Sequence, residues 1–324
     1  MFSTNKKFNL KNYKKIFLMA PANIYTGGPE LTHQLGYILK NELNKDIKIY
    51  YIPSNINEPV HKNLKKYSLK FTNYIDDDPQ NLLIIPEYFY FLKIANSFKK
   101  IEKAIWWQSL DNYFGSRFRD NNPKLSRSVL KIPFNIINLF NKTTRFFFGI
   151  LTIENYLKYL YSTQNIRNHQ ELKQAFFHLA QSNYAFDFLK KKFENVGFLS
   201  DFIREDLVQN NKITKKEKEN IICYNPLKCN EFMKLLIKKN DFNFVPLINL
   251  NNDEIINTLS KSKIYIDIGS HPGKDRLPRE AALLGNCIIT NLKGSAANSN
   301  DVSIPNEFKF KENYNNLEKI NSKI

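Results

Sequence analysis

The sequence predicts an α/β protein with two domains, each a doubly wound and mostly parallel sheet. Short apolar segments alternate with amphipathic helical segments along most of the chain, which is typical of parallel sheets covered by helices. This alternation stops at residues 204–220, which are highly charged and barely apolar, and then restarts. The 324 residues are long for one domain and comfortable for two of about 150 residues each.

The first domain begins with a short apolar run at residues 14–21, which we interpret as a strand. Pro29 and Glu30 then begin a helical pattern, because proline suits the first helical position and an acid suits the first turn. Further apolar runs predict strands, the last two separated by a turn and a helix: residues 45–53, 81–87, 103–109, the start of 176–193, and 195–203.

The second domain repeats this alternation after the charged stretch. We place the boundary there, with residues 1–205 in the first domain and 206–324 in the second. Strands are predicted at residues 220–226, 242–250, 263–269 and 286–291. Helices are predicted at 229–240, at 252–262 and at a segment from Arg276 that ends in a glycine.

One segment, about residues 117–175, fits neither half and is interpreted as a helical insertion in the first domain. Residues 117–145 carry seven basic side chains and a single acid, Asp120. Its apolar residues share one helical face, but Lys142 and Arg145 interrupt the run, so it is a poor membrane span. Two hypotheses stay open: a basic amphipathic helix on an anionic membrane surface, or a helical pair packed on its own domain.

The formal charge of +17 fits three kinds of partner: nucleic acid, an anionic membrane surface, or phosphorylated small molecules. No helix-turn-helix, zinc-finger or aromatic RNA-binding signature is present, so we do not expect nucleic acid binding. The three cysteines are odd in number and lack metal-ligand spacing, which favours small buried side chains in a reducing cytoplasm. The N-terminal residues are basic without an apolar core, so no signal peptide is expected.

The densest group of charges follows the predicted strand at residues 263–269. The loop after Ser270 and the first turn of the next helix carry three cations and two acids beside a histidine: His271, Lys274, Asp275, Arg276, Arg279 and Glu280. We expect a diphosphate bound by Lys274, Arg276 or Arg279 and by the helix N-terminus. Glu280 would then accept hydrogen bonds from a ribose diol. The alternative is a solvated charged loop whose Glu280 only caps the helix.

Two further loops of small residues follow predicted strands. Residues 293–298, which include Ser295, are expected to close over the nucleotide or sugar. Gly27 and Gly28 precede a helix, where the backbone can approach a phosphate and the helix N-terminus supplies N–H groups. This loop matches neither the dinucleotide fingerprint nor the P-loop, and a merely structural turn is the alternative.

An acceptor-side base is expected at the carboxyl ends of the first domain's strands. Glu87 and Asp111 both follow predicted strands, and either can accept a proton from a hydroxyl group. A structural role is the alternative for each. His33, on the first helix, is expected to be structural.

Residues 265–296, YIDIGSHPGKDRLPREAALLGNCIITNLKGSA, resemble the donor-binding half of nucleotide-sugar glycosyltransferases of the GT-B fold. The closest similarity is to the bacterial branch that builds capsule, lipopolysaccharide and related surface glycans. Four shorter segments also look similar to that branch: TGGPELTHQL (26–35), WWQSLDNYF (106–114), AQSNYAFDFL (180–189) and YNPLK (224–228). The resemblance implies two Rossmann-like domains that face each other across a ligand cleft, and it skips residues 117–176.

The resemblance also implies roles for single residues. Glu280 matches the second glutamate of an E-x7-E motif that binds the nucleotide ribose, and Lys228 matches a basic residue facing the donor diphosphate. Gly27 and Gly28 match the loop that approaches the donor phosphates. The first glutamate of the motif falls at Pro272 and is absent. We therefore expect His271, Lys274 or Asp275 to contact the donor sugar, whose identity and stereochemical course stay open.

No metal and no cofactor is expected. No Asp-x-Asp metal motif is apparent, since the acidic residues 76–78 lie in a polar turn. Charge on the leaving diphosphate would be stabilised by Lys and Arg side chains and by helix dipoles.

The function implied by the resemblance is sugar transfer from a nucleotide-diphosphate donor to a glycan or lipid-linked acceptor in bacterial surface polysaccharide synthesis. We expect a cytoplasmic protein bound peripherally to the inner face of the membrane. The alternatives are a non-catalytic relative that binds a glycan or nucleotide sugar or pairs with an active enzyme as a partner subunit, a nucleotide-sugar epimerase, and a basic nucleic-acid binder. The sequence stops short of the family's long C-terminal helices, so a truncated second domain is expected.

Overall fold

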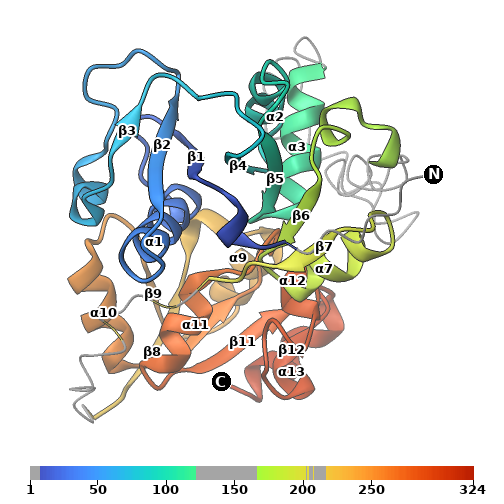
Figure 1. Ribbon diagram of the computed structural model, residues 1–324. Coiled ribbons are helices and arrows are strands. Elements are labelled where there is room, and N and C mark those ends of the chain that lie inside the picture. The colour runs from blue at the N-terminus through green and yellow to red at the C-terminus, as the bar shows by residue number, and fades with distance from the viewer. Residues whose placement is uncertain (1–7, 122–165, 202, 204–206, 208–216) are drawn as a thin grey trace. The chain divides into compact units, whose positions relative to one another are not determined.

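The computed structural model describes residues 8–121, 166–201, 203, 207 and 217–324 (Figure 1). The chain divides into two compact units. Unit 1 comprises Met1–Gln181 and Ala185–Leu199, and unit 2 comprises Ser182–Tyr184 and Ser200–Ile324. The helical face expected within residues 117–175 lies mostly outside the described residues, so both hypotheses about it stay open.

Unit 1 contains a seven-stranded parallel sheet in the order β3-β2-β1-β4-β5-β6-β7. Its strands are β1 Lys15–Pro21, β2 Asp46–Ile52, β3 Phe71–Thr72, β4 Leu82–Pro86, β5 Glu102–Trp107, β6 Phe177–Ala180 and β7 Val196–Phe198. The chain builds outward from β1 in one direction and then, from β4 on, in the other. The switch point of this sheet, where ligands of such folds bind, is therefore between β1 and β4.

The central strands of unit 1, β1, β4, β5 and β6, are buried on both faces, which explains their continuous apolar sequences. Five consecutive residues of β1, from Ile16 to Ala20, are buried, and helix α1 contributes Leu31 and Leu39 to the core on one face. Among the described residues up to β7, the helices are α1 Gly27–Asn41, α2 Phe89–Ala95, α3 Leu110–Asn121 and α7 Asn183–Lys190. Short 3₁₀ helices lie at η1 Leu10–Asn12, η2 Lys62–Tyr67, η3 Ile166–Asn168 and η4 Gln170–Leu172.

Unit 2 contains a five-stranded parallel sheet in the order β12-β11-β10-β8-β9. Its strands are β8 Glu219–Tyr224, β9 Asn243–Pro246, β10 Ser262–Asp267, β11 Cys287–Asn291 and β12 Lys309–Phe310. Strand β9 lies on one side of β8, and all later strands lie on the other side. The switch point of this sheet is between β8 and β10.

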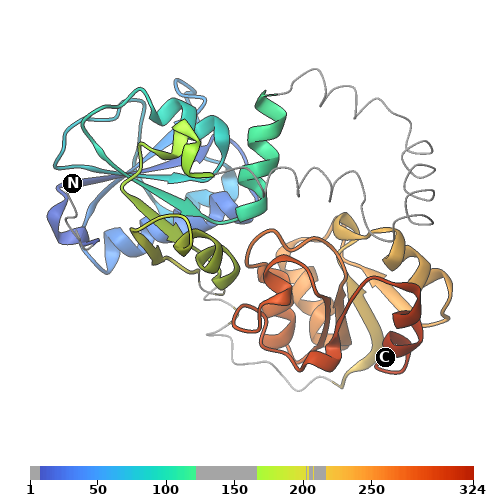
Figure 2. The ribbon, with the colours of Figure 1, turned by 90° about the vertical axis from the view of Figure 1, so that its right-hand side faces the viewer.

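Helices cover both faces of the unit 2 sheet (Figure 2). Ile264 and Ile266 of β10 pack with α9 and α13, whereas Tyr265 between them packs with α10 and α11. In the described part of unit 2, the α-helices are α9 Glu231–Lys238, α10 Asn252–Lys261, α11 Arg276–Leu283, α12 Gly294–Ala297 and α13 Leu317–Asn321. The 3₁₀ helices described there are η5 Pro226–Lys228, η6 Asn306–Phe308 and η7 Tyr314–Asn316.

The predicted α/β class with doubly wound parallel sheets is confirmed, and one local expectation needs correction. Helix α11 begins at Arg276 with Asp275 at its N-cap, so Glu280 is its fifth residue and not part of the first turn. Across the described part of the chain, helices with both the length and the apolarity to cross a bilayer are not found.

Candidate active site

The switch point of the unit 2 sheet gathers four ionisable side chains, which we call the Lys228 cluster: Lys228, Asp267, His271 and Asp275. Lys228 ends η5, directly after β8, and Asp267 is the last residue of β10. His271 and Asp275 lie in the loop between β10 and α11. Because β8 and β10 are neighbouring parallel strands, their carboxyl ends meet at one edge of the sheet.

The contacts within the Lys228 cluster are short. The Lys228 Nζ donates a hydrogen bond of 2.6 Å to Asp275 Oδ2 and lies 3.6 Å from Asp267 Oδ2. The His271 Nδ1 is 2.9 Å from the same Asp275 oxygen. The His271 Nε2 is 3.2 Å from the backbone oxygen of Asp267 and 3.6 Å from its Oδ1. Two carboxylates therefore share two basic side chains.

The cluster is buried at one end and open at the other. The side chains of Asp267 and His271 are each 1% exposed, whereas those of Lys228 and Asp275 are 21% and 25% exposed. Burial by itself would raise the pKa of Asp275, but the hydrogen bond from His271 and the Lys228 ammonium outweigh it. The pKa of Asp275 is therefore held below its ordinary value, which keeps this carboxylate ionised at neutral pH.

Close backbone packing holds Lys228 against β10. A Cβ added to Gly269 would come within 2.6 Å of Lys228 Cβ and 2.7 Å of the Lys228 backbone oxygen. The Asn225 side chain caps η5 by accepting a hydrogen bond from the Leu227 N–H. Asn230 Nδ2 donates to the Ile268 backbone oxygen over 2.7 Å. A glycine at position 269 is thus what allows Lys228 to reach the two carboxylates.

Residues 293–298, which are expected to close over the nucleotide or sugar, pack on the loop between β10 and α11 that carries His271. Ser295 is buried; its Oγ donates to the Gly273 backbone oxygen over 2.6 Å, and its N–H donates to the His271 backbone oxygen over 3.0 Å. Gly294 has a φ of +52°, and a Cβ there would lie only 1.9 Å from the same His271 oxygen. In this structure Ser295 therefore fixes the loop that carries His271.

The predicted phosphate-binding cations already have protein partners. The Arg279 Nη2 donates to Asp201 Oδ2 over 2.5 Å, and the Asp201 side chain is fully buried. The Lys274 Nζ donates to the Ser200 Oγ over 3.1 Å. Arg276 is the first residue of α11, and Glu280 is buried one turn further on. Binding of a diphosphate by Lys274 or Arg279 stays a prediction, and it requires these contacts to be exchanged.

In unit 1, the glycine loop and Glu87 follow the two strands that flank its switch point. Helix α1 begins at Gly27. A Cβ on Gly28 would lie 2.8 Å from Gln108 Oε1, whereas a Cβ on Gly27 would meet nothing within 4 Å. The Gln108 backbone N–H donates to Glu87 Oε2 over 3.0 Å, and its Nε2 donates to the Thr32 Oγ1 over 3.3 Å. Gln108 therefore links the glycine helix to Glu87.

Among the described residues of unit 1, Glu87 is a buried carboxyl group whose pKa lies near neutral pH. It is buried, and this burial raises its pKa to about 7, although backbone N–H groups that include those of Gln108 and Ser109 act in the opposite direction. A carboxyl group with a pKa near neutrality suits general base catalysis. Asp111 is half-buried in the first turn of α3, where the helix dipole favours an acid for structural reasons alone.

His33 is held by protein groups on both ring nitrogens. Its Nδ1 is 2.7 Å from the Pro29 backbone oxygen, and its Nε2 is 2.7 Å from the Tyr51 hydroxyl. This arrangement agrees with the structural role expected for His33.

Sequence reasoning missed two residues, Asp267 and Gln108. Asp267 is a lone carboxylate in the otherwise apolar strand segment IYIDIG, and this was the available signal. Gln108 directly follows the two tryptophans that end β5, where a polar residue at a strand terminus is a weaker signal.

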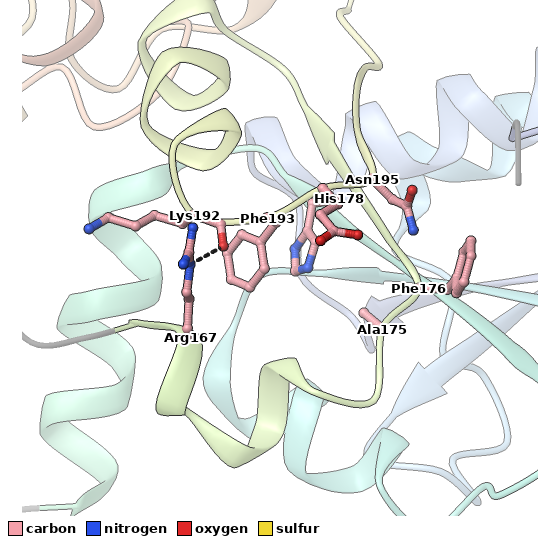
Figure 3. Close-up of a pocket in the computed structure, with 8 residues that line it drawn as sticks. Arg167, Ala175, Phe176, His178, Lys192, Phe193 and Asn195 are labelled. Atoms are coloured by element: carbon pink, nitrogen blue, oxygen red, sulfur yellow. Dashed lines mark hydrogen bonds between the residues drawn. The ribbon is translucent and has the colours of Figure 1, made fainter. Parts of the chain in front are cut away.

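Unit 1 also contains a cavity of about 390 Å³ (Figure 3). It is lined by Arg167, Ala175, Phe176, His178, Lys192, Phe193, Glu194 and Asn195. Phe176 and Asn195 directly precede β6 and β7, so the cavity is at the amino ends of these strands. The His178 ring stacks on Phe193, and burial lowers its pKa to about 3, so this histidine is neutral. None of the predicted site residues lines this cavity.

Comparisons with known proteins identify the fold. No family model matches the sequence, and no curated protein does either. A sucrose-phosphate synthase from Thermosynechococcus elongatus is similar at 9% identity over 96% of this chain and 89% of that chain, with a TM-score of 0.56. A glycosyltransferase from Rickettsia africae is similar at 14% identity over 96% and 87%, with a TM-score of 0.54.

This chain has the GT-B fold. The N-terminal domain of trehalose-6-phosphate phosphatase from Candida albicans is also similar, at 9% identity over 98% of this chain and 91% of that chain, with a TM-score of 0.51. The resemblance found in residues 265–296 is thereby confirmed at the level of the fold. Many functions share one fold, so the chemistry of this GT-B chain depends on the residues of its site.

Proposed function

We propose that this chain is a glycosyltransferase that moves a sugar from a nucleotide-diphosphate donor to a glycan or lipid-linked acceptor. The observation that carries the proposal is the Lys228 cluster, which sits at the switch point of the unit 2 sheet beside the N-terminus of α11. This is where doubly wound sheets bind nucleotides. The names of two similar structures, a sucrose-phosphate synthase and a glycosyltransferase, support the same reaction class.

The donor would be bound by unit 2. In this proposal Lys228, Arg276 and the N-terminus of α11 hold the diphosphate, and Glu280 accepts hydrogen bonds from the ribose hydroxyls. The Lys228 ammonium exchanges the Asp275 carboxylate for phosphate oxygens, which its 21% exposure permits. Asp275 keeps its hydrogen bond with His271 during this exchange, so it is not left unpaired.

The transfer step breaks one bond and forms one. The acceptor hydroxyl oxygen bonds to the anomeric carbon, and the bond between that carbon and the diphosphate oxygen breaks, leaving its electron pair on the diphosphate. The hydroxyl proton goes to Glu87, with Asp111 as the second candidate. Lys228 and the helix N-terminus stabilise the developing negative charge, so the proposed step requires no metal.

The acceptor side and the location of the reaction are also proposals. A net charge of +17 favours association with anionic membrane surfaces and with phosphorylated, lipid-linked acceptors. We therefore propose a peripheral protein at the cytoplasmic face of a bacterial membrane, acting in surface polysaccharide synthesis.

A donor screen tests this function. The full chain is incubated with each common nucleotide sugar, and release of the nucleoside diphosphate is measured with and without candidate acceptors. We expect slow hydrolysis of one donor class by the wild-type protein and its loss in Glu280→Ala. The matched control is Glu231→Ala, because Glu231 is an exposed glutamate of the same unit that pairs with Lys234. Absence of turnover with every donor would contradict the proposal that this chain is a glycosyltransferase.

A non-catalytic sugar-nucleotide-binding or glycan-binding protein is the second candidate. The observation that favours it is that Lys228, Lys274 and Arg279 are all bonded to other protein groups. This candidate predicts saturable binding of a nucleotide sugar by calorimetry without any release of the diphosphate. Detectable sugar transfer by the purified chain would remove it.

A further inference from the structure

We infer that Asp267, His271 and Asp275 form a binding site for a divalent transition-metal ion, such as Zn²⁺, whose place is taken here by the Lys228 ammonium. Each of the three residues offers one ligand atom, and these atoms lie within 4.8 Å of one another. The residues are spaced four apart, from the last residue of β10 into the following loop. This inference goes beyond the proposed sugar transfer and does not depend on it.

The ligand chemistry and the spacing suit one ion. Imidazole nitrogen and carboxylate oxygen bind Zn²⁺ at about 2.0–2.2 Å. The His271 Nδ1 and Asp275 Oδ2 are 2.9 Å apart. Two ligands at about 2.1 Å from one ion are that far apart when the angle between them is near a right angle. These two atoms therefore need little movement to bind the same ion.

The partners around the ligands resemble those that orient ligands in metal sites. A metal-binding histidine commonly donates its other ring N–H to a backbone carbonyl or a carboxylate. The His271 Nε2 is 3.2 Å from the Asp267 backbone oxygen, so it can direct an N–H to that oxygen while Nδ1 binds an ion. The ion would then replace the Nδ1–H that bonds Asp275 in the present structure, and it would contact both the Nδ1 lone pair and the Asp275 oxygen. Tyr265 also orients Asp267, because its hydroxyl donates to Oδ2 over 3.3 Å.

A second observation points to a cation at this position. Among the residues that the structure describes, no donor hydrogen-bonds the buried Oδ1 of Asp267, and the Asp267 side chain is only 1% exposed. A buried carboxylate oxygen without a donor is costly, and a bound cation offsets that cost. The neighbouring His271 Nε2 is 3.6 Å away, beyond hydrogen-bonding distance.

The Lys228 ammonium supplies positive charge to this site in the present structure. It contacts the Asp275 carboxylate at 2.6 Å and lies 3.6 Å from that of Asp267. Lys228 and Asp275 are the partly exposed members of the cluster, which gives an ion a path from solvent. Metal binding must displace this ammonium, so the lysine and the ion compete for the same two carboxylates.

Because Lys228 and the ion compete for the same carboxylates, removal of the Lys228 ammonium is expected to tighten zinc binding. Zn²⁺ alone is titrated into the folded full chain by calorimetry, in the wild type, in Lys228→Met and in Lys274→Met. We expect Lys228→Met to bind one Zn²⁺ per chain about tenfold more tightly than the wild type, or more. Lys274→Met removes the same charge from the loop that carries His271 and Asp275, but the Lys274 Nζ bonds Ser200 and not the cluster, so we expect wild-type affinity.

Removal of a ligand gives the second part of the test. Asp267→Asn and Asp275→Asn, each in the Lys228→Met background, are expected to weaken Zn²⁺ binding about 100-fold. Asp275→Asn keeps the test decisive where replacing the buried Asp267 disturbs folding, which circular dichroism reports. Cys229→Ser and Cys287→Ser are expected to leave the binding unchanged, which separates this site from a thiolate site. Absence of stoichiometric binding by Lys228→Met at millimolar zinc, or unchanged binding in both Asp variants, would overturn the inference.

Discussion

The Nζ of Lys228 and the Oδ2 of Asp275 are 2.6 Å apart, although 47 positions of sequence separate the two residues. The pair forms because β8 and β10 are neighbours at the switch point of the unit 2 sheet and both deliver charged residues to its carboxyl edge. An anionic ligand at this edge competes with Asp275 for the ammonium. The affinity of the site for a diphosphate is therefore set in part by this internal ion pair.

The Asp275→Asn variant tests that competition directly. Replacement of the carboxylate by an amide frees the Lys228 ammonium and removes a negative charge from the edge. We expect nucleoside diphosphate to bind more tightly by about 1.5 kcal/mol, the value of one charge-assisted hydrogen bond, as measured by calorimetry. Weaker binding would show instead that Asp275 contacts the donor itself.

Glu87 predicts a specific pH dependence of the reaction. Its pKa is raised from 4.5 to about 7, so the carboxylate that accepts the proton forms only as pH rises through neutrality. We expect the transfer rate to increase with pH around 7. In Glu87→Gln we expect a large loss of turnover and no such increase. An unchanged increase around pH 7 in Glu87→Gln would assign the titration to another group.

The same shift makes a prediction about stability. Between pH 4.5 and about 7, folded Glu87 holds a proton that the unfolded chain has released. The free energy of unfolding therefore falls as pH rises through this window, by at most about 1.4 kcal/mol per pH unit, and then levels off. Urea unfolding at several pH values measures this dependence, and we expect the unfolding free energy of Glu87→Gln to change less with pH than that of the wild type. Parallel pH dependences in the two proteins would contradict a buried Glu87 with a raised pKa.

The two loop glycines of unit 1 are expected to respond differently to alanine. A Cβ on Gly28 presses on Gln108 Oε1 and displaces that side chain from Thr32, which we expect to cost about 0.5–1.5 kcal/mol of unfolding free energy. Gly27→Ala meets open space and is expected to leave stability within about 0.5 kcal/mol. Reduced donor binding in Gly27→Ala with unchanged stability would then report ligand approach to this loop. Equal destabilisation by Gly27→Ala and Gly28→Ala would contradict this expected difference.

Gly294 is expected to be the most sensitive glycine of unit 2. Gly294 and Gly285 both have positive φ, of +52° and +82°, so alanine is strained at each by about 1–2 kcal/mol. A Cβ on Gly294 also overlaps the His271 backbone oxygen, whereas one on Gly285 meets only Lys218 side-chain atoms at 3.5 Å or more. Chemical denaturation should therefore rank Gly294→Ala as clearly less stable than Gly285→Ala. Equal values would mean that the His271 loop can move away.

Much of the fold was predictable because the buried parallel strands consist of consecutive apolar residues. The segments around β1, β4, β5 and β10 were located within one or two residues for this reason. The two-residue strands β3 and β12 were not predicted, since two residues carry no periodicity. Helix α2 was also missed, because the aromatic segment FYFLKIA has no start signal apart from its position after a strand.

The site was predictable as a loop but not as a set of contacts. The charges between His271 and Glu280 stand out in the sequence, and Lys228 was found through the resemblance. The pairings of Lys228 with Asp275 and of Arg279 with Asp201 join residues that are 47 and 78 positions apart. Such long-range side-chain contacts cannot be inferred from a single sequence. The raised pKa of Glu87 likewise depends on burial, which only the folded chain defines.

The most direct test of the central claim, that the carboxyl edge of the unit 2 sheet binds a nucleoside diphosphate, is calorimetric titration of the full chain with a panel of nucleoside diphosphates. The matched variants are Lys228→Ala and Lys263→Ala, since Lys263 is an exposed lysine at the amino end of β10 that contacts Asn220. We predict saturable binding of at least one diphosphate that Lys228→Ala weakens at least tenfold, by about 1.4 kcal/mol or more, while Lys263→Ala leaves it unchanged. No binding by the wild type, or equal affinities in the two variants, would contradict the account.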